Sequence, residues 1–219
     1  MKRPFSASGD VVAMAMAIRD SLPPEAFAAA DEEAARRKAD VTARRILRSD
    51  MPKRFANCAP SMPETAAWAE GAANGEPSNL VLYGEAGCGK TREACAALQI
   101  AAKSKPVLFA TFGDVLRAVR STYGAGEGTE ETALSRYRSV SVLCIDDLGK
   151  ERPTADALEK LFALLDFRYG RMKPTVFTTQ YTPQTLPRRL MAEGADYEQV
   201  DAIMRRVYQG AKAVAMDGR

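Results

Sequence analysis

The chain lacks several residue types and patterns, and each absence excludes a class of protein. Its 219 residues include no histidine, which excludes histidine general bases and histidine–metal sites. The four cysteines (Cys58, Cys88, Cys95 and Cys144) form no C-x-x-C pair and have no zinc-ligand spacing, which is typical of reduced thiols. No apolar run approaches the length of a membrane span. We therefore expect a cytoplasmic protein with no membrane partner.

The N-terminus has only a superficial likeness to a secretory signal. Lys2 and Arg3 precede an apolar stretch over residues 11–18, but Asp10 interrupts this order and an Arg-Asp pair follows the stretch. The pattern favours an amphipathic helix over a signal peptide. The net charge of +3 is mildly basic, which permits contact with nucleic acid without demanding it.

Residues 84–91 match the phosphate-binding pattern G-x-x-x-x-G-K-[ST], with an apolar strand predicted before them and a helix after them. Glycines let the backbone turn its N–H groups toward phosphate oxygens, and the helix N-terminus adds partial positive charge. Lys90 is expected to reach the β- and γ-phosphates of ATP, and the Thr91 hydroxyl to bind Mg²⁺. The predicted nucleotide-binding residues are Gly84, Glu85, Ala86, Gly87, Cys88, Gly89, Lys90 and Thr91.

A second apolar strand, over residues 140–145, ends at two carboxylates, Asp146 and Asp147. Because ligands bind at the carboxyl ends of strands in open α/β sheets, both are expected to face the phosphates. Asp146 is the candidate magnesium ligand, and Asp147 the candidate for orienting and deprotonating an attacking water. The next strand ends in Thr-Thr-Gln, and Gln180 is a candidate contact of that water or of the γ-phosphate.

Strand and helix patterns alternate along the rest of the chain, which predicts a parallel sheet with helices on both faces. Two domains are expected: a helical N-terminal arm over 1–50 and an ATPase domain over 51–219. The predicted strands cover 80–83, 106–111, 140–145, 174–179 and 211–216. One helix is predicted to begin at Thr91. Two more are predicted over 113–123 and 154–169, and further helices within 183–209. Residues 51–79, with four prolines, are predicted to be a connector.

The arm pattern predicts two helices separated by Pro23 and Pro24. The first carries a stripe of Val11, Met14, Ile18 and Leu22, and the second runs roughly from residue 25 to residue 48. The second helix is rich in Ala, Arg and Glu and has a thin apolar stripe. A helix of this kind either stays solvated or finds a partner, and the sequence leaves both open.

The stretch from Met51 to Arg219 resembles the bacterial helicase-loader ATPases of the DnaC type and the related IstB transposition ATPases, both AAA+ proteins. The likeness is carried by the Met-Pro-Lys-Arg-Phe run over 51–55, the P-loop, and Ile-Asp-Asp-Leu-Gly over 145–149. It continues through 167–169, 173–180 and 202–207. The resemblance implies a five-stranded AAA+ sheet, preceded here by the short helical arm and followed by no C-terminal lid domain.

The resemblance also assigns roles to single residues. The family's sensor position falls on Gln180, where relatives usually carry Asn, and its trans-acting arginine falls on Arg206, with Arg205 as fallback. Such an arginine completes the ATP site of a neighbouring protomer, which implies a homo-oligomer. AAA+ proteins usually place Glu at the position of Asp147, so hydrolysis here is expected to be slow. Arg219 corresponds to a family arginine near the C-terminus.

The helix predicted over 113–123 occupies the place where helicase loaders contact single-stranded DNA. Arg117 and Arg120 lie three residues apart, on one face, and Tyr123 follows them. Basic side chains beside an aromatic ring suit a single strand. An ordinary amphipathic helix with solvated arginines explains the same pattern, and the sequence does not separate the two.

The leading functional hypothesis is an ATP-dependent loader or remodeller of a replicative DNA helicase, encoded by a phage or another mobile element. An IstB-like helper of a transposase shares the core motifs, so the partner of the arm discriminates between them. An ATP-binding adaptor with weak or no hydrolysis and a small-molecule P-loop kinase are further alternatives. The kinase requires an acceptor pocket and a basic lid that no segment obviously supplies.

Overall fold

The computed structural model describes residues 13–14, 24–122, 129–151, 154–191 and 196–217. The chain divides into two units, Met1–Val41 and Thr42–Arg219, and the larger unit holds the sheet and every element discussed below except most of α2. Among the described helices, none is both long and apolar enough to span a bilayer.

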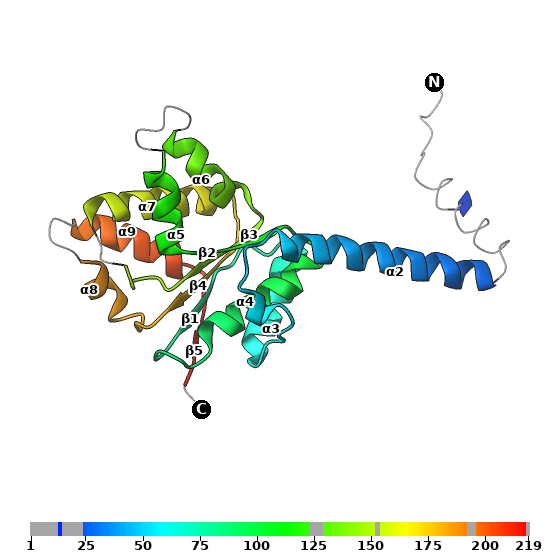
Figure 1. Ribbon diagram of the computed structural model, residues 1–219. Helices are drawn as coiled ribbons and strands as arrows, with labels where there is room; N and C mark the ends of the chain where they lie inside the picture. Colours follow the sequence, from blue (N-terminus) through cyan, green and yellow to red (C-terminus); the bar gives the residue numbers. More distant parts are fainter. Residues whose placement is uncertain (1–12, 15–23, 123–128, 152–153, 192–195, 218–219) are drawn as a thin grey trace, which may run out of the picture. The chain divides into compact units, whose positions relative to one another are not determined.

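Five parallel strands form one sheet in the order β2-β3-β4-β1-β5 (Figure 1). Residues of the four strands β1 to β4 are almost all buried, as expected of a sheet covered on both faces. This confirms the predicted five-stranded sheet, and each predicted strand lies within two residues of an observed one. The strands are β1 (Leu80–Tyr83), β2 (Val107–Thr111), β3 (Val142–Asp146), β4 (Thr175–Thr179) and β5 (Lys212–Ala215).

Helices cover both faces of the sheet (Figure 1). Successive strand residues point to opposite faces, so Val81 packs with one set of helices while Leu80 and Leu82 pack with the other. One face is covered by α3 (Pro63–Asn74) and α4 (Lys90–Ala102). The other is covered by α5 (Phe112–Arg120), α6 (Glu130–Ser139), α7 (Ala155–Gly170), α8 (Leu186–Leu190) and α9 (Tyr197–Tyr208).

The prediction of a plain connector over 51–79 is wrong, because this stretch contains the 3₁₀ turn η1 (Lys53–Phe55) and helix α3. Pro63 is the first residue of α3, where the missing N–H breaks no helical hydrogen bond. Glu93 of α4 is fully buried and accepts hydrogen bonds from the backbone N–H groups of Ser61 and Met62 at 2.9–3.0 Å. This carboxylate joins the helix after the P-loop to the start of α3.

The sequence reading also omitted α6, which follows the glycine-rich loop. Thr129 caps this helix by accepting a hydrogen bond from the N–H of Thr132 at 3.3 Å. Only Leu134 and Tyr137 of α6 are buried, so its sequence carries little of the apolar periodicity that marks a helix.

Arg168 of α7 is buried without a carboxylate partner. Its guanidinium donates to the carbonyl oxygens of Tyr137, Val140 and Pro174 at 2.8–2.9 Å and to the Thr175 hydroxyl at 3.0 Å. Burial lowers the pKa of Arg168 to about 9. This side chain fastens the end of α6 to the amino ends of β3 and β4.

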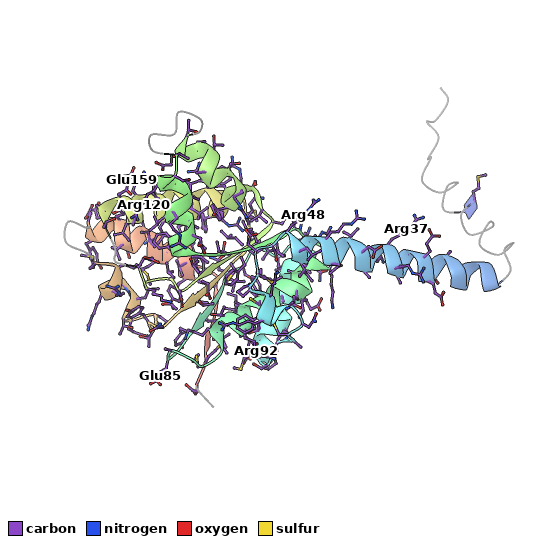
Figure 2. All side chains as sticks on the ribbon, in the orientation of Figure 1. Arg37, Arg48, Glu85, Arg92, Arg120 and Glu159 are labelled. Carbon is purple, nitrogen blue, oxygen red and sulfur yellow. The ribbon has the colours of Figure 1, made fainter. Side chains whose placement is uncertain are left out.

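The predicted second helix of the arm is confirmed as α2 (Pro24–Leu47). Its side chains from residue 30 to residue 41 are exposed, and Arg37 (Figure 2) pairs with Glu33 one turn earlier. Just before the predicted domain boundary at residue 50, Arg45 donates to the Ala102 carbonyl at 2.9 Å and the Ser49 carbonyl accepts from the Phe109 N–H at 2.7 Å. The helix predicted from Val11 to Leu22 lies almost wholly outside the described residues.

Candidate nucleotide-binding site

The predicted P-loop connects the carboxyl end of β1 to the first turn of α4, as its motif requires. Gly84, Gly87 and Gly89 have φ angles of 151°, 86° and 94°, values that side chains rarely allow. A Cβ atom on Gly84 would lie 2.1 Å from the Met216 carbonyl oxygen, at the end of β5. Glu85, within the loop, and Arg92, directly after it, are labelled in Figure 2. The loop therefore has the backbone shape that a phosphate cradle needs.

Lys90 lies against the inside of this loop and is 6% exposed. Its ammonium donates hydrogen bonds to the carbonyl oxygens of Gly84 at 2.8 Å and Glu85 at 2.6 Å. The Cys88 sulfur lies 3.5 Å from the same nitrogen. A positive charge is thus held within the loop, where a phosphate group would be bound.

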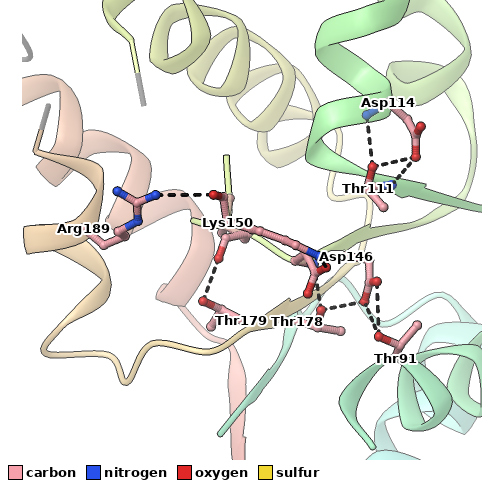
Figure 3. Close-up of polar contacts among 10 residues, drawn as sticks. Thr91, Thr111, Asp114, Asp146, Lys150, Thr178, Thr179 and Arg189 are labelled. Atoms are coloured by element: carbon pink, nitrogen blue, oxygen red, sulfur yellow. Dashed lines mark hydrogen bonds and ion pairs between the residues drawn. The ribbon is translucent and has the colours of Figure 1, made fainter. Parts of the chain in front are cut away.

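Thr91 and Asp146 meet where α4 faces the end of β3 (Figure 3). The Thr91 hydroxyl donates to the two carboxylate oxygens at 3.1 and 3.2 Å, and the Thr178 hydroxyl donates to Oδ1 at 2.6 Å. Burial raises the pKa of Asp146, and the hydrogen bond from Thr178 opposes this shift. The pair presents only oxygen ligands, the type that Mg²⁺ prefers.

The residues present fit a magnesium ion that is completed by phosphate and water. Among the described residues, no group of three or more histidine, cysteine or acidic side chains is placed to hold a metal alone. Mg²⁺ in nucleotide sites is usually bound by one or two protein ligands together with phosphate oxygens and waters. Thr91 and Asp146 match that pattern.

A cavity of about 390 Å³ joins the P-loop to Asp147 and Gln180. Asp147 has a φ of 58°, and its N–H donates to the Thr178 hydroxyl at 2.9 Å. Its side chain is 25% exposed, and its Oδ2 accepts a hydrogen bond from Lys150 at 2.7 Å. The structure therefore brings together the P-loop, the aspartate pair and Gln180, which lie far apart along the chain.

Three residues that line this cavity were missed as site residues: Arg54, Phe55 and Arg92. The Arg54 guanidinium lies 4.5 Å from the centre of the Phe55 ring. A flat aromatic ring with a cation on it suits stacking against a purine base. Arg54 and Phe55 belong to the 51–55 run that carries part of the family resemblance, and this run was the available signal for them.

Arg206 does not line this cavity. Its guanidinium pairs with Asp166 at 2.9 Å and lies 4.4 Å from the centre of the Tyr169 ring. Its carbonyl accepts from the Asn79 side chain at 2.8 Å, at the amino end of β1, whereas the P-loop follows the carboxyl end. Arg205 pairs with Asp201 at 2.7 Å. Arg206 thus lies apart from the nucleotide cavity of its own chain.

Two of the three predicted DNA-contacting residues, Arg117 and Arg120, lie on α5. Arg117 is 68% exposed and pairs with Asp114, which completes a capping box with Thr111. Arg120 is exposed and is labelled in Figure 2. Tyr123 and Arg219 lie outside the described residues.

The sheet, the P-loop and the Asp146–Thr91 pair define an AAA+ type nucleotide-binding protein. A family model described as "IstB-like ATP binding protein" matches residues 65–219, and the chain belongs to that family. It is therefore an AAA+ protein of the DnaC/IstB type.

Curated relatives come from a phage-like element, an insertion sequence and a replication system. The chain is 29% identical over 118 residues to the phage-like element PBSX protein XkdC of Bacillus subtilis. This match covers 51% of this chain and 43% of the relative. The chain is 28% identical over 141 residues to the putative insertion sequence ATP-binding protein y4uH of Sinorhizobium fredii, with 64% of this chain and 54% of the relative covered. The chain is 26% identical over 120 residues to the replicative helicase loader DnaC of Escherichia coli, with 53% of this chain and 48% of the relative covered. The chain spans about half the length of these relatives.

Solved structures show the same fold. The crystal structure of DnaI matches with a TM-score of 0.63 and 25% identity, covering 77% of this chain and 96% of that one. The crystal structure of the DnaC helicase loader matches with a TM-score of 0.62 and 21% identity, covering 76% and 100%.

Proposed function

We propose that this chain binds ATP with Mg²⁺, hydrolyses it slowly at a site shared between protomers, and uses the cycle to load or remodel a replicative DNA helicase. The observation that carries the proposal is the single cavity in which the P-loop, Asp147 and Gln180 meet beside Thr91 and Asp146. Membership of the IstB-like ATP binding family and similarity to a helicase loader support it.

Each part of the cavity has a role in this proposal. The P-loop amides and Lys90 bind the phosphates, and the Arg54–Phe55 pair stacks on the base. Thr91 and Asp146 hold the magnesium ion, which when bound neutralises charge on the β- and γ-phosphates. Asp147 and Gln180 orient the attacking water, and Asp147 accepts its proton.

We propose a shared site because of the position of Arg206. Because Arg206 lies apart from its own cavity, its guanidinium would exchange Asp166 and the Tyr169 ring for a γ-phosphate held by a second copy, where such an arginine contributes about 10³–10⁵ in rate. Arg206→Ala should bind ATP yet fail to hydrolyse it, and mixing it with Lys90→Ala should restore part of the turnover. Arg205→Ala tests the fallback position: it should keep wild-type turnover if Arg206 is the trans-acting arginine, and lose turnover if Arg205 has that role. No rescue at any mixing ratio would argue against a shared site.

The partner is tested by reconstitution with the full chain. A purified replicative helicase, single-stranded circular DNA and ATP should yield more DNA-bound helicase with this chain than without it, and Lys90→Ala should abolish the gain. We propose direct contact of Arg117 and Arg120 with the strand, since both are exposed on α5. The double substitution to Ala should then weaken single-strand binding, while the same double change at Arg188 and Lys103 should not.

The second candidate is an ATP-dependent helper of a transposase. The match to an insertion sequence ATP-binding protein, which covers 64% of this chain, favours it. Stimulation of strand transfer by a purified transposase, with no effect on helicase loading, would decide for this candidate. ATP binding with no turnover under either condition would instead indicate an adaptor that uses nucleotide only as a switch.

A further inference from the structure

The turn after β3 folds back so that Lys150 reaches Asp147. The Leu148 N–H donates to the Thr178 carbonyl at 2.8 Å, and the Lys150 N–H donates to the Asp147 carbonyl at 3.0 Å. Asp147 and Gly149 both have positive φ, at 58° and 89°. The result is the 2.7 Å hydrogen bond from the Lys150 ammonium to Asp147 Oδ2.

This turn is fastened from two other elements (Figure 3). Arg189 of α8 donates from Nε to the Gly149 carbonyl at 2.8 Å and from Nη2 to the carbonyls of Lys150 and Glu151 at 3.3 Å. The Thr179 hydroxyl donates to the Leu148 carbonyl at 2.7 Å. These hydrogen bonds restrain the backbone that carries Lys150, whereas its side chain is 64% exposed.

A second cavity, of about 90 Å³, lies beside the nucleotide cavity. Its lining includes Asp147 and Gln180, which the two cavities share, together with Lys150 and Tyr181. The volume is sufficient for several water molecules. The ammonium, the carboxylate and the amide thus meet at the place where an attacking water would be held.

We propose that Lys150 is a positioning residue that restrains Asp147. Its ammonium occupies Oδ2, an oxygen that would otherwise accept a proton from the attacking water, and so keeps ATP turnover low until the ion pair opens. This inference rests on the proposed role of Asp147 in hydrolysis. In that reaction the water oxygen bonds to the γ-phosphorus, the bond from this phosphorus to the bridging oxygen of ADP breaks, and the water proton passes to Asp147.

The restraint is necessarily weak. Lys150 is 64% exposed at its side chain, and ion pairs between exposed groups shift an equilibrium only modestly. Removing the ammonium should therefore raise turnover by about two- to fivefold and not by orders of magnitude. Weakness also means that a partner carrying acidic groups can open the pair.

The test compares ATP turnover and ATP affinity of full-length wild type, Lys150→Gln, Lys150→Arg and Lys150→Gln combined with Asp147→Asn. Lys103→Gln is the matched control, because it removes an exposed lysine charge at the far end of α4. We expect the two- to fivefold rise only in Lys150→Gln, with unchanged affinity for a fluorescent ATP analogue. Lys150→Arg should stay near the wild-type rate, and the double variant should lose the rise.

A second readout does not depend on activity. The hydrogen bond to Asp147 raises the pKa of Lys150, so an NMR titration of the lysine Cε resonances should show this pKa fall in Asp147→Asn. Turnover of Lys150→Gln at or below a measurable wild-type rate, or an unchanged Lys150 titration in Asp147→Asn, would overturn the inference alone. Wild-type protein that binds no ATP would instead overturn the proposed function, and ATP binding without turnover in every variant would overturn both.

Discussion

Replacing Gly84 with alanine should destabilise the protein through a collision of two backbones. The new Cβ would lie 2.1 Å from the Met216 carbonyl oxygen, so one chain segment must move by about 1 Å to reach an ordinary carbon–oxygen contact of about 3.3 Å. Met216 is held in place because its N–H donates to the Tyr83 carbonyl at 2.8 Å. Overpacking of this kind costs about 1–3 kcal/mol, and the positive φ adds about 1–2 kcal/mol.

Gly87→Ala is the matched control, since its Cβ would meet no atom within 4 Å while its φ is also positive, at 86°. It should lose only the conformational part, about 1–2 kcal/mol. Thermal unfolding without nucleotide separates the two, because each kcal/mol lowers the Tm by about 2–4 °C in a chain of this size. Equal Tm values for the two variants would refute the collision, and with it the contact between the P-loop and the end of β5.

Three further variants test the buried charges. Asp146→Asn should be at least as stable as wild type at pH 7 without nucleotide. Burial raises the pKa of Asp146, so the contribution of this carboxyl group to wild-type stability is fully present at low pH and falls as pH rises through the raised pKa. The Tm difference should therefore shrink toward pH 4, while Mg²⁺-dependent ATP binding is lost. Arg168→Met should cost about 3–5 kcal/mol in urea unfolding, because several buried carbonyls lose their donor; a cost below 1 kcal/mol would contradict this. Glu93→Gln should cost about 1–3 kcal/mol in the same assay, since an amide NH₂ would face the donors of Ser61 and Met62; unchanged stability would show that the carboxylate does not stabilise the segment that precedes α3.

The sequence predicted the sheet and the phosphate loop because both follow from local patterns. Apolar strands, a glycine-rich turn and carboxylates at a strand end are all visible within short windows. Helix α3 was missed because the four prolines of residues 51–79 were interpreted as marking a connector, although Pro63 suits a first helical turn. Helix α6 was missed because only Leu134 and Tyr137 carry its buried face.

Contacts between segments that are distant along the chain could not be predicted from the sequence. No local pattern places Phe55 in the nucleotide cavity, pairs Arg206 with Asp166, or buries Arg168 among carbonyls. The contacts of Arg168, for example, depend on the strand order, because it bonds carbonyl groups at the starts of the neighbouring strands β3 and β4. The bond of Lys150 to Asp147 spans only three residues, but it depends on the two positive φ angles in the turn.

Calorimetric titration of the full chain with ATP in Mg²⁺ tests the phosphate cradle most directly. Wild type should bind ATP, and Lys90→Ala, which removes the ammonium held inside the loop, should bind at least tenfold more weakly while keeping its Tm within a few degrees. Equal affinity of the two proteins, or no heat from folded wild type, would contradict the assignment of this loop as an ATP site.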